Sequence, residues 1–204
     1  MLRTNYMKKF LSHFKFNAPV TLSFVALCMI ALLVDRLTNG WANNNLFVTY
    51  RSGLLNPMTY VRAIAYTFGH ASWEHFTGNM TFILLLGPLV EEKYGSKNLA
   101  EMMIITAVIT AILNSILSRN VGILGASGIV FMLIILSSIS NVKSGEIPIT
   151  FVIICIIYLG QQILQCFEQD SISQLAHIVG GLCGGFFGLF MIGHEKEEKS
   201  PAAE

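Results

Sequence analysis

Ser127 stands in the stretch 122–131, GILGASGIVF, where small residues flank a serine and an apolar run follows at once. If a helix begins at Ser127, its free backbone N–H groups and its dipole favour a developing negative charge beside the serine. Such a serine can act as a nucleophile when a base removes its proton. The alternative is a packing serine, because Gly125, Ala126 and Gly128 also let neighbouring helices approach closely.

His177 is the candidate base. It opens the stretch AHIVGGLCGGFFG and is the only histidine in the last two apolar segments of the chain. At about 100° per residue, His177 shares one helix face with three glycines that allow a close helix contact, namely Gly181, Gly184 and Gly188. We therefore expect His177 to face another helix, on which Gly128 supplies a complementary small site.

No carboxylate is expected at the depth of Ser127 and His177. Glu168 and Asp170 lie in the loop before the last apolar segment, and Glu91 lies at the opposite membrane face. The predicted catalytic unit is therefore a Ser–His dyad that lacks the acidic third member of a catalytic triad.

His75 and Asn79 are candidates for stabilising an oxyanion. They are four residues apart in HASWEHFTGNM, so they lie on one face of a helix. Neutral His and Asn side chains can donate hydrogen bonds to an oxyanion. His70 falls off that face and is expected to anchor the preceding loop. A metal site built from His70, His75 and His177 is an alternative, although no carboxylate or thiolate is expected at a matching depth.

The composition indicates an integral membrane protein. Of the 204 residues, 53% are hydrophobic and 12% are charged, whereas soluble domains carry about 25% charged residues. The net charge of +1 gives no indication of nucleic-acid binding. The four cysteines form no metal-binding pattern and are interpreted as small buried hydrophobic residues.

Six apolar segments each approach the roughly 20 residues that cross a bilayer. They lie at about residues 19–34, 73–90, 99–117, 127–140, 147–167 and 172–192. We therefore predict an all-α membrane protein, a bundle of six transmembrane helices within residues 19–192. The fourth helix, about 14 residues or about 21 Å long, is shorter than the roughly 30 Å hydrocarbon core, which places Ser127 about 10 Å below the outer surface.

Residues 35–72 form a long first loop of mixed aromatic, apolar and polar residues, which is expected to lie in the membrane interface. Residues 1–18 predict a basic amphipathic segment on the inner leaflet, and residues 193–204 a polar, disordered tail. Nine Lys and Arg side chains fall on one side of the six-span arrangement and four on the other, which puts both termini in the cytoplasm.

In these blocks the sequence resembles the rhomboid family of intramembrane serine proteases. The likeness runs from about residue 62 to residue 188 and includes an HxxxxHxxxN pattern, GxSG at 125–128 and AHxxG at 176–180. Glu91 and the pair Gly95–Ser96 match residues that close the second span in many members. The order and spacing of the blocks make the resemblance specific.

The resemblance implies chemical roles for the central residues. Ser127 would be the nucleophile, and His177 the general base and then the acid for the leaving amine. The oxyanion and the substrate would be bound by the Ser127 backbone N–H together with three residues: His75, Asn79 and Ala126.

The resemblance also implies supporting residues. His70 would give structural support to the site, and Phe131 would pack near the catalytic histidine. Arg62 belongs to a Trp-Arg pair that the long first loop of the family often carries, and here Val61 stands in place of the tryptophan.

The activity implied is that of an endopeptidase that cleaves single-span membrane proteins near the outer leaflet through an acyl-enzyme, without a cofactor or a metal ion. Its partners would be transmembrane-helix substrates and the lipid bilayer, with no nucleic acid, and a monomer would suffice for catalysis. The expected location is a prokaryotic plasma membrane. One alternative is a non-catalytic rhomboid-like protein that binds membrane clients, although such proteins usually lack the serine or the histidine that this chain keeps. A small transporter is a second alternative, which would predict an internal repeat that the sequence does not display.

Overall fold

The computed structural model describes residues 17–118, 121–139 and 171–199, together with residues 149, 152–153 and 156–157. Its elements in chain order are α2 (Pro19–Leu37), the π-helix η1 (Asn43–Phe47), α3 (Pro57–Ala65), α4 (Trp73–Tyr94), α5 (Ser96–Leu117), α6 (Ser127–Ile139) and α8 (Ser171–Lys199). Most of the predicted fifth span, the loop at 168–170 and the N-terminal segment 1–16 lie outside the described residues. The described part of the chain is mainly helical, as the apolar segments predict.

Local sequence signals define where several of these helices begin. Ser72 is the N-cap of α4, and its hydroxyl accepts a hydrogen bond from the His75 backbone N–H at 3.1 Å. Asn56 caps α3 in the same way and is followed by a proline at the first helical position. These caps fix the first turn of each helix, and the first turn of α4 carries His75.

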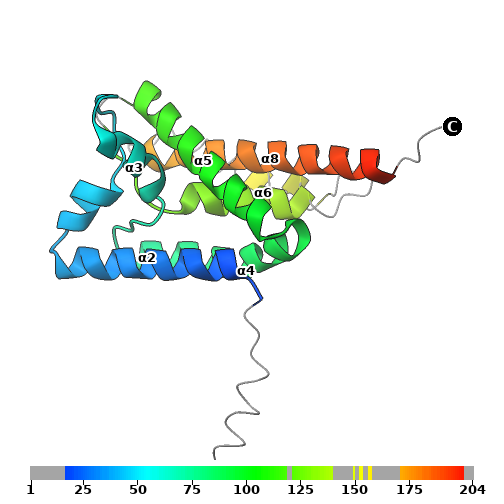
Figure 1. Ribbon diagram of the computed structural model, residues 1–204, viewed down its shortest axis with the longest axis horizontal. Helices are drawn as coiled ribbons and strands as arrows, with labels where there is room; N and C mark the ends of the chain where they lie inside the picture. Colours follow the sequence, from blue (N-terminus) through cyan, green and yellow to red (C-terminus); the bar gives the residue numbers. More distant parts are fainter. Residues whose placement is uncertain are drawn as a thin grey trace, which may run out of the picture.

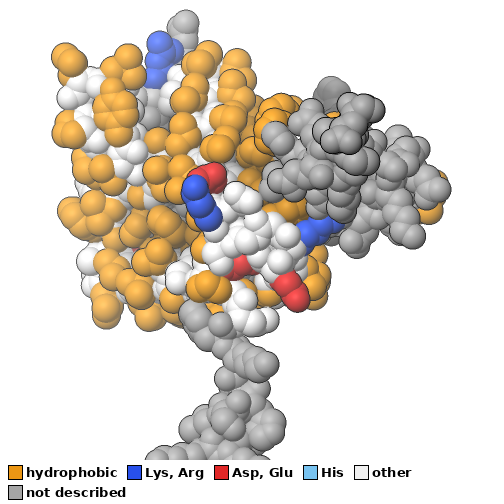
Figure 2. All heavy atoms as spheres, turned by 45° about the vertical axis from the view of Figure 1, so that its right-hand side comes forward, with side chains coloured by type: hydrophobic (Ala, Val, Ile, Leu, Met, Phe, Trp, Pro, Cys, Tyr) orange, Lys and Arg blue, Asp and Glu red, His pale blue; other side chains and the backbone are white. Residues whose placement is uncertain are grey.

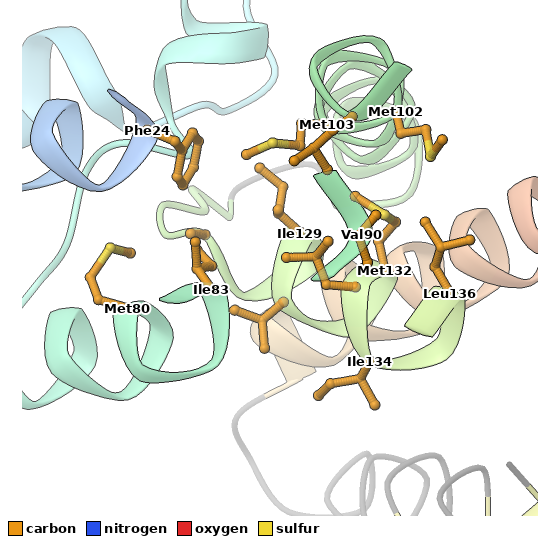
Figure 3. Close-up of a cluster of buried hydrophobic side chains, with 14 of the residues drawn as sticks. Phe24, Met80, Ile83, Val90, Met102, Met103, Ile129, Met132, Ile134 and Leu136 are labelled. Atoms are coloured by element: carbon orange, nitrogen blue, oxygen red, sulfur yellow. The ribbon is translucent and has the colours of Figure 1, made fainter. Parts of the chain in front are cut away.

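The short helix α6 is the centre of the molecule. Ten of its 13 residues are buried, and its most extensive packing is against α8. In Figure 1, α2 and α8 run along opposite sides with α6 between them, and α3 lies at the end where α2 finishes and α8 begins. Figure 3 shows side chains of α2, α4 and α5 gathered around α6, among them Phe24, Ile83 and Met103.

Glycines let α6 and α8 touch through their backbones. A Cβ atom added at Gly128 would lie 3.1 Å from the carbonyl oxygen of Ala176, and one added at Gly180 would overlap the carbonyl oxygen of Gly128. The same holds between Gly184 and the Met132 carbonyl. The contact row on α8 therefore runs through residues 176, 180, 184 and 188. It contains the expected Gly184 and Gly188, together with Ala176 and Gly180, which we did not expect in it. His177 lies one position beside this row.

Glu91 joins three helices at the other end of the bundle. Its carboxylate accepts hydrogen bonds from the backbone N–H groups of Val20 and Thr21, both at 2.9 Å, and from the Thr21 hydroxyl at 2.8 Å. The Ser96 hydroxyl, at the start of α5, donates to it at 2.7 Å. Because Ala18, the N-cap of α2, makes no side-chain bond to the helix, Glu91 supplies the acceptor that this terminus lacks.

The loop between α2 and α4 is tied to both helices by polar contacts. The Asp35 carboxylate accepts from the Asn43 backbone N–H at 2.8 Å, and the Asn43 amide donates to the His70 carbonyl at 3.0 Å. The fully buried His70 ring contacts the Phe68 carbonyl through Nδ1 and the Asn79 amide through Nε2, each at 3.1 Å. If Nδ1 donates to the carbonyl, Nε2 is left as the acceptor for Asn79.

Arg62 provides the second anchor of this loop. Its Nε and Nη2 atoms donate to the Asn45 carbonyl at 3.1 and 2.6 Å, and Nη1 donates to the Tyr50 hydroxyl at 2.7 Å. The guanidinium also lies 4.9 Å from the centre of the Tyr50 ring. Val61, at the position of the family's tryptophan, is 53% exposed. In this chain the loop is therefore held by Arg62 without that tryptophan.

Much of the outer surface is apolar. Among the described residues, α2 and α5 are long and apolar enough to cross a membrane, judged by length and composition. α6 is an apolar helix below that length. Figure 2 shows a face that is largely hydrophobic, with a few charged side chains gathered in one area. This distribution is typical of a protein surrounded by lipid.

The last helix is longer than we expected. We expected it to end at about residue 192 and to be followed by a disordered tail, whereas α8 continues to Lys199. The added segment is rich in Glu and Lys, which are good helix formers, so the helix can continue after the apolar residues end.

Two adjacent glycines of α8 test the backbone contact with α6. A Gly184→Ala change would place its Cβ against the Met132 backbone, and we expect it to lower stability by about 1–3 kcal/mol. At Gly185 an added Cβ meets only the Ile135 side chain at 4.0 Å. Gly185→Ala should therefore leave the melting temperature unchanged or raise it, because alanine favours a helix by up to about 1 kcal/mol. Thermal unfolding of both variants in one detergent measures the difference, and equal losses would contradict the contact.

The titration of His70 gives a second prediction. Burial lowers the pKa of His70 to about 4, with the hydrogen bond to Phe68 partly offsetting this effect. An unfolded chain protonates this ring below a pH of about 6.5. The free energy of unfolding is therefore unaffected by His70 above that pH. It decreases as the pH falls towards 4, by about 2 kcal/mol at pH 5. Between pH 8 and pH 5, the melting temperature of His70→Gln should fall less than that of the natural chain. Equal falls would argue against His70 as the group that titrates.

Candidate active site

A cavity of about 660 Å³ opens between α4, α6 and α8. Its lining includes four of the residues that the sequence analysis selected: Ser127, His177, His75 and Asn79. Phe131 and Ala176 also line it. The structure thus brings the predicted nucleophile, base and oxyanion residues to one space from three helices that are far apart in sequence.

Ser127 is the first residue of α6 and is half-buried. The preceding turn depends on Gly125, whose φ of +119° is a conformation that other residues rarely adopt. The Gly125 N–H donates to the Tyr66 carbonyl at 2.9 Å, and the Ala126 carbonyl accepts from the Val130 N–H at 3.0 Å. Ser127 therefore lies at a helix N-terminus, and backbone hydrogen bonds hold the two residues that precede it.

The backbone contact between α6 and α8 also sets the relation of Ser127 to His177. Gly128 follows Ser127 directly and meets Ala176, which precedes His177 directly. The two side chains consequently start from neighbouring backbone positions and both reach the cavity. The His177 ring is stacked on Phe131, with ring centres 4.3 Å apart and an angle of 14° between the planes. Phe131 is one turn after Ser127, so α6 supplies both the hydroxyl and the surface that orients the imidazole.

His75 and Asn79 form the α4 side of the cavity. The His75 ring is packed against the Gly125 backbone, since a Cβ atom at Gly125 would lie 2.6 Å from Cε1 and 2.7 Å from Nε2. Asn79 Nδ2 lies 3.8 Å from the same point. A residue larger than glycine at position 125 would therefore displace His75. The predicted pair shares one face of α4, and that face is directed at the turn before Ser127.

His70 fixes the orientation of the Asn79 amide. One Nδ2 hydrogen of Asn79 is directed at His70 Nε2, and the amide group carries a second hydrogen that can serve a ligand in the cavity. The His70 and His75 rings also meet edge to face, with centres 5.0 Å apart. We expected His70 to anchor the loop. His70 also bonds directly to Asn79. This contact could not be predicted from helical periodicity, because His70 lies before the start of α4 and Asn79 lies within it.

A metal ion has no evident place among these groups. Within the described residues, no group of three or more His, Cys, Asp or Glu side chains could hold one. Both His70 nitrogens already contact protein atoms. The chemistry that the arrangement can perform is a nucleophilic attack by Ser127 assisted by His177, with donors from α4 and α6 beside the reacting atoms.

Known proteins are similar to this chain in sequence. Rhomboid-like protein 11, chloroplastic, of Arabidopsis thaliana is 31% identical over 134 residues, which cover 65% of this chain and 45% of that protein. Rhomboid-related protein 1 of Caenorhabditis elegans is 28% identical over 142 residues, covering 64% and 40%. This chain thus spans less than half of the length of these two relatives. Rhomboid protease GlpG of Haemophilus influenzae is 22% identical over 186 residues, covering 89% and 94%.

The family model of the Rhomboid domain matches residues 57–194. This region begins at the first residue of α3 and includes α4, α5, α6 and most of α8, so it contains every residue of the cavity named above. Because the match covers well over half of the chain, this chain belongs to the rhomboid family of integral membrane proteins.

Proposed function

We propose that this chain is an intramembrane serine endopeptidase that cleaves single-span membrane proteins near the outer leaflet. The observation that supports this most directly is the shared cavity, where Ser127 and His177 meet His75 and Asn79 close to the N-terminal ends of α4, α6 and α8. The first turns of α4 and α6 line this cavity, and helix N-termini favour negative charge, which is what an acyl-transfer transition state develops.

In the proposed reaction, Ser127 Oγ attacks the carbonyl carbon of the substrate as His177 takes the hydroxyl proton. The carbonyl oxygen becomes an oxyanion, stabilised by the free Nδ2 hydrogen of Asn79, by His75 and by the N-terminus of α6. The peptide C–N bond then breaks, and the leaving amine receives the proton from His177. Water attacks the resulting ester with His177 again as the base, which releases the acid product and restores Ser127.

The proposed dyad assigns no acid to the orientation of the histidine, although Glu74 also lines the cavity. In a triad, a buried carboxylate holds the imidazole in place. Here the ring of His177 is held by its stacking on Phe131 and by the position of its backbone beside the α6–α8 contact. We therefore propose that Phe131 orients His177 and that Ala126 lies beside the oxyanion.

The membrane arrangement belongs to the same proposal. Residues 19–192 form a six-span bundle with both termini in the cytoplasm of a prokaryotic cell, as the excess of Lys and Arg on that side supports. Residues 1–18 and 193–204 are cytoplasmic flanking segments. The substrate helix unwinds and enters between the second and fifth spans, and a monomer performs the reaction without a cofactor.

The decisive variants are Ser127→Ala and His177→Ala, assayed with a single-span test substrate in liposomes. Each should lower the cleavage rate by at least about 1,000-fold, because the nucleophile and its base act as one unit. Ser138→Ala is a matched control on the same helix, since its hydroxyl is bonded to the Ile134 carbonyl at 2.7 Å. It should cleave at the natural rate, and undiminished cleavage by Ser127→Ala would exclude the dyad.

Labelling separates this proposal from a non-catalytic rhomboid-like protein that binds membrane clients. A fluorophosphonate probe should attach covalently to the natural chain and should not attach to Ser127→Ala, because only an activated serine reacts. Mass spectrometry of the labelled peptide identifies the site. A natural chain that binds the test substrate but neither cleaves it nor takes up the probe would favour the client-binding function.

A further inference from the structure

One side of α4 lines the cavity along more than two turns. Glu74, Gly78 and Phe82 all contribute to the cavity wall, and their spacing of four residues places them on one helix face. Each of the first two directly precedes an oxyanion candidate, since His75 follows Glu74 and Asn79 follows Gly78. This strip, Glu74–Gly78–Phe82, therefore runs beside the reacting groups.

The strip changes in chemistry along its length. At its inner end, Phe82 offers an apolar ring. In its middle, Gly78 is exposed, and a Cβ atom added there would meet no described atom within 4 Å. At its outer end, Glu74 is exposed in the first turn of α4. A polypeptide lying along the strip would therefore meet a carboxylate at one end and an apolar surface at the other, with space between them.

Glu74 is the only Asp, Glu, Lys or Arg residue among the described residues that line this cavity. An exposed glutamate is ionised at neutral pH. The carboxylate is hydrogen-bonded to its own backbone N–H and to the Ser72 hydroxyl, and Arg36, which donates to the Ala71 carbonyl at 2.7 Å, is close enough to act on its charge. The ion pair found within the described residues is elsewhere, between Lys97 and Glu101. Because Glu74 is exposed and forms no ion pair within 4.0 Å among the described residues, a positive charge on a ligand can still approach its carboxylate.

Resting on the proposed protease function, we propose that Glu74 selects substrates with a Lys or Arg two or three residues from the cleaved bond. Asn79 is five positions after Glu74 in the helix, which is about 7.5 Å along the axis. An extended chain covers this distance in two or three residues at about 3.3 Å each. The favoured basic residue therefore lies two or three positions from the cut, on the side nearer the outer end of α4.

The test uses substrates that differ at one position, with Lys, Gln or Glu placed two or three residues from the cut on either side. At one such position the natural chain should prefer Lys to Glu in kcat/KM by about 2- to 5-fold, the range of an exposed ion pair. The ratio should fall to about one in Glu74→Gln and should reverse in Glu74→Lys. In an uncharged detergent the preference should also decrease as salt is raised, because salt screens exposed charges.

Glu101→Gln is the control, because it removes one negative charge from α5 at a residue that does not line the cavity. It should keep the Lys-to-Glu ratio of the natural chain. A ratio near one at every position, or an unchanged ratio in Glu74→Gln, overturns the role of Glu74 while cleavage itself continues. Absence of cleavage of every substrate, or cleavage that persists in Ser127→Ala, is a failure of the protease function instead.

Discussion

The backbone contact between α6 and α8 is the constraint on which the site depends. Gly128 and Gly180 leave no room for a side chain between the two helices, so the helices have one way to meet. That contact sets Ser127 and His177 beside each other, because each residue is the direct neighbour of a contact residue. Packing interactions of this kind are the main source of helix association in lipid, where apolar side chains gain nothing by leaving their surroundings.

Polar contacts then hold the remaining elements around α6. At one end of the bundle, Glu91 accepts four hydrogen bonds and closes the N-terminus of α2. At the other end, His70 joins the first loop to Asn79, and within that loop Arg62 joins α3 to the Asn45 carbonyl of η1. Buried polar groups are stable only when they are paired. Of these pairs, the bond between His70 and Asn79 also orients the α4 side of the cavity.

Some of this arrangement could be predicted from local sequence. The stretch of small residues followed by an apolar run places the start of a helix at Ser127, and α6 begins there. The spacing of His75 and Asn79 predicts a shared face, which the cavity confirms. The beginnings of α2 and α4 also agree with the predicted spans. Pro19 is the first residue of α2, and Ser72 is the N-cap of α4.

Other features depend on contacts that sequence patterns do not encode. Helical periodicity allows α8 to contact another helix through a row that contains Gly181 or through one that contains Gly180. The position of α6 in the structure shows that the row with Gly180 makes the contact. The bond from His70 to Asn79 spans the loop–helix boundary at Ser72, and the bonds from Glu91 to α2 join residues about 70 positions apart. The extension of α8 to Lys199 shows that residues of high helix propensity can continue a helix beyond its apolar segment.

The structure of a phosphonate adduct would test the central claim, that Ser127 and the α4 donors form one reaction site. The phosphorus atom should be bonded to Ser127 Oγ, and one phosphonyl oxygen should lie within about 3 Å of Asn79 Nδ2 and of a donor from His75 or the start of α6. Attachment at another residue would contradict the account. So would an adduct whose oxygen is directed away from Asn79 and His75.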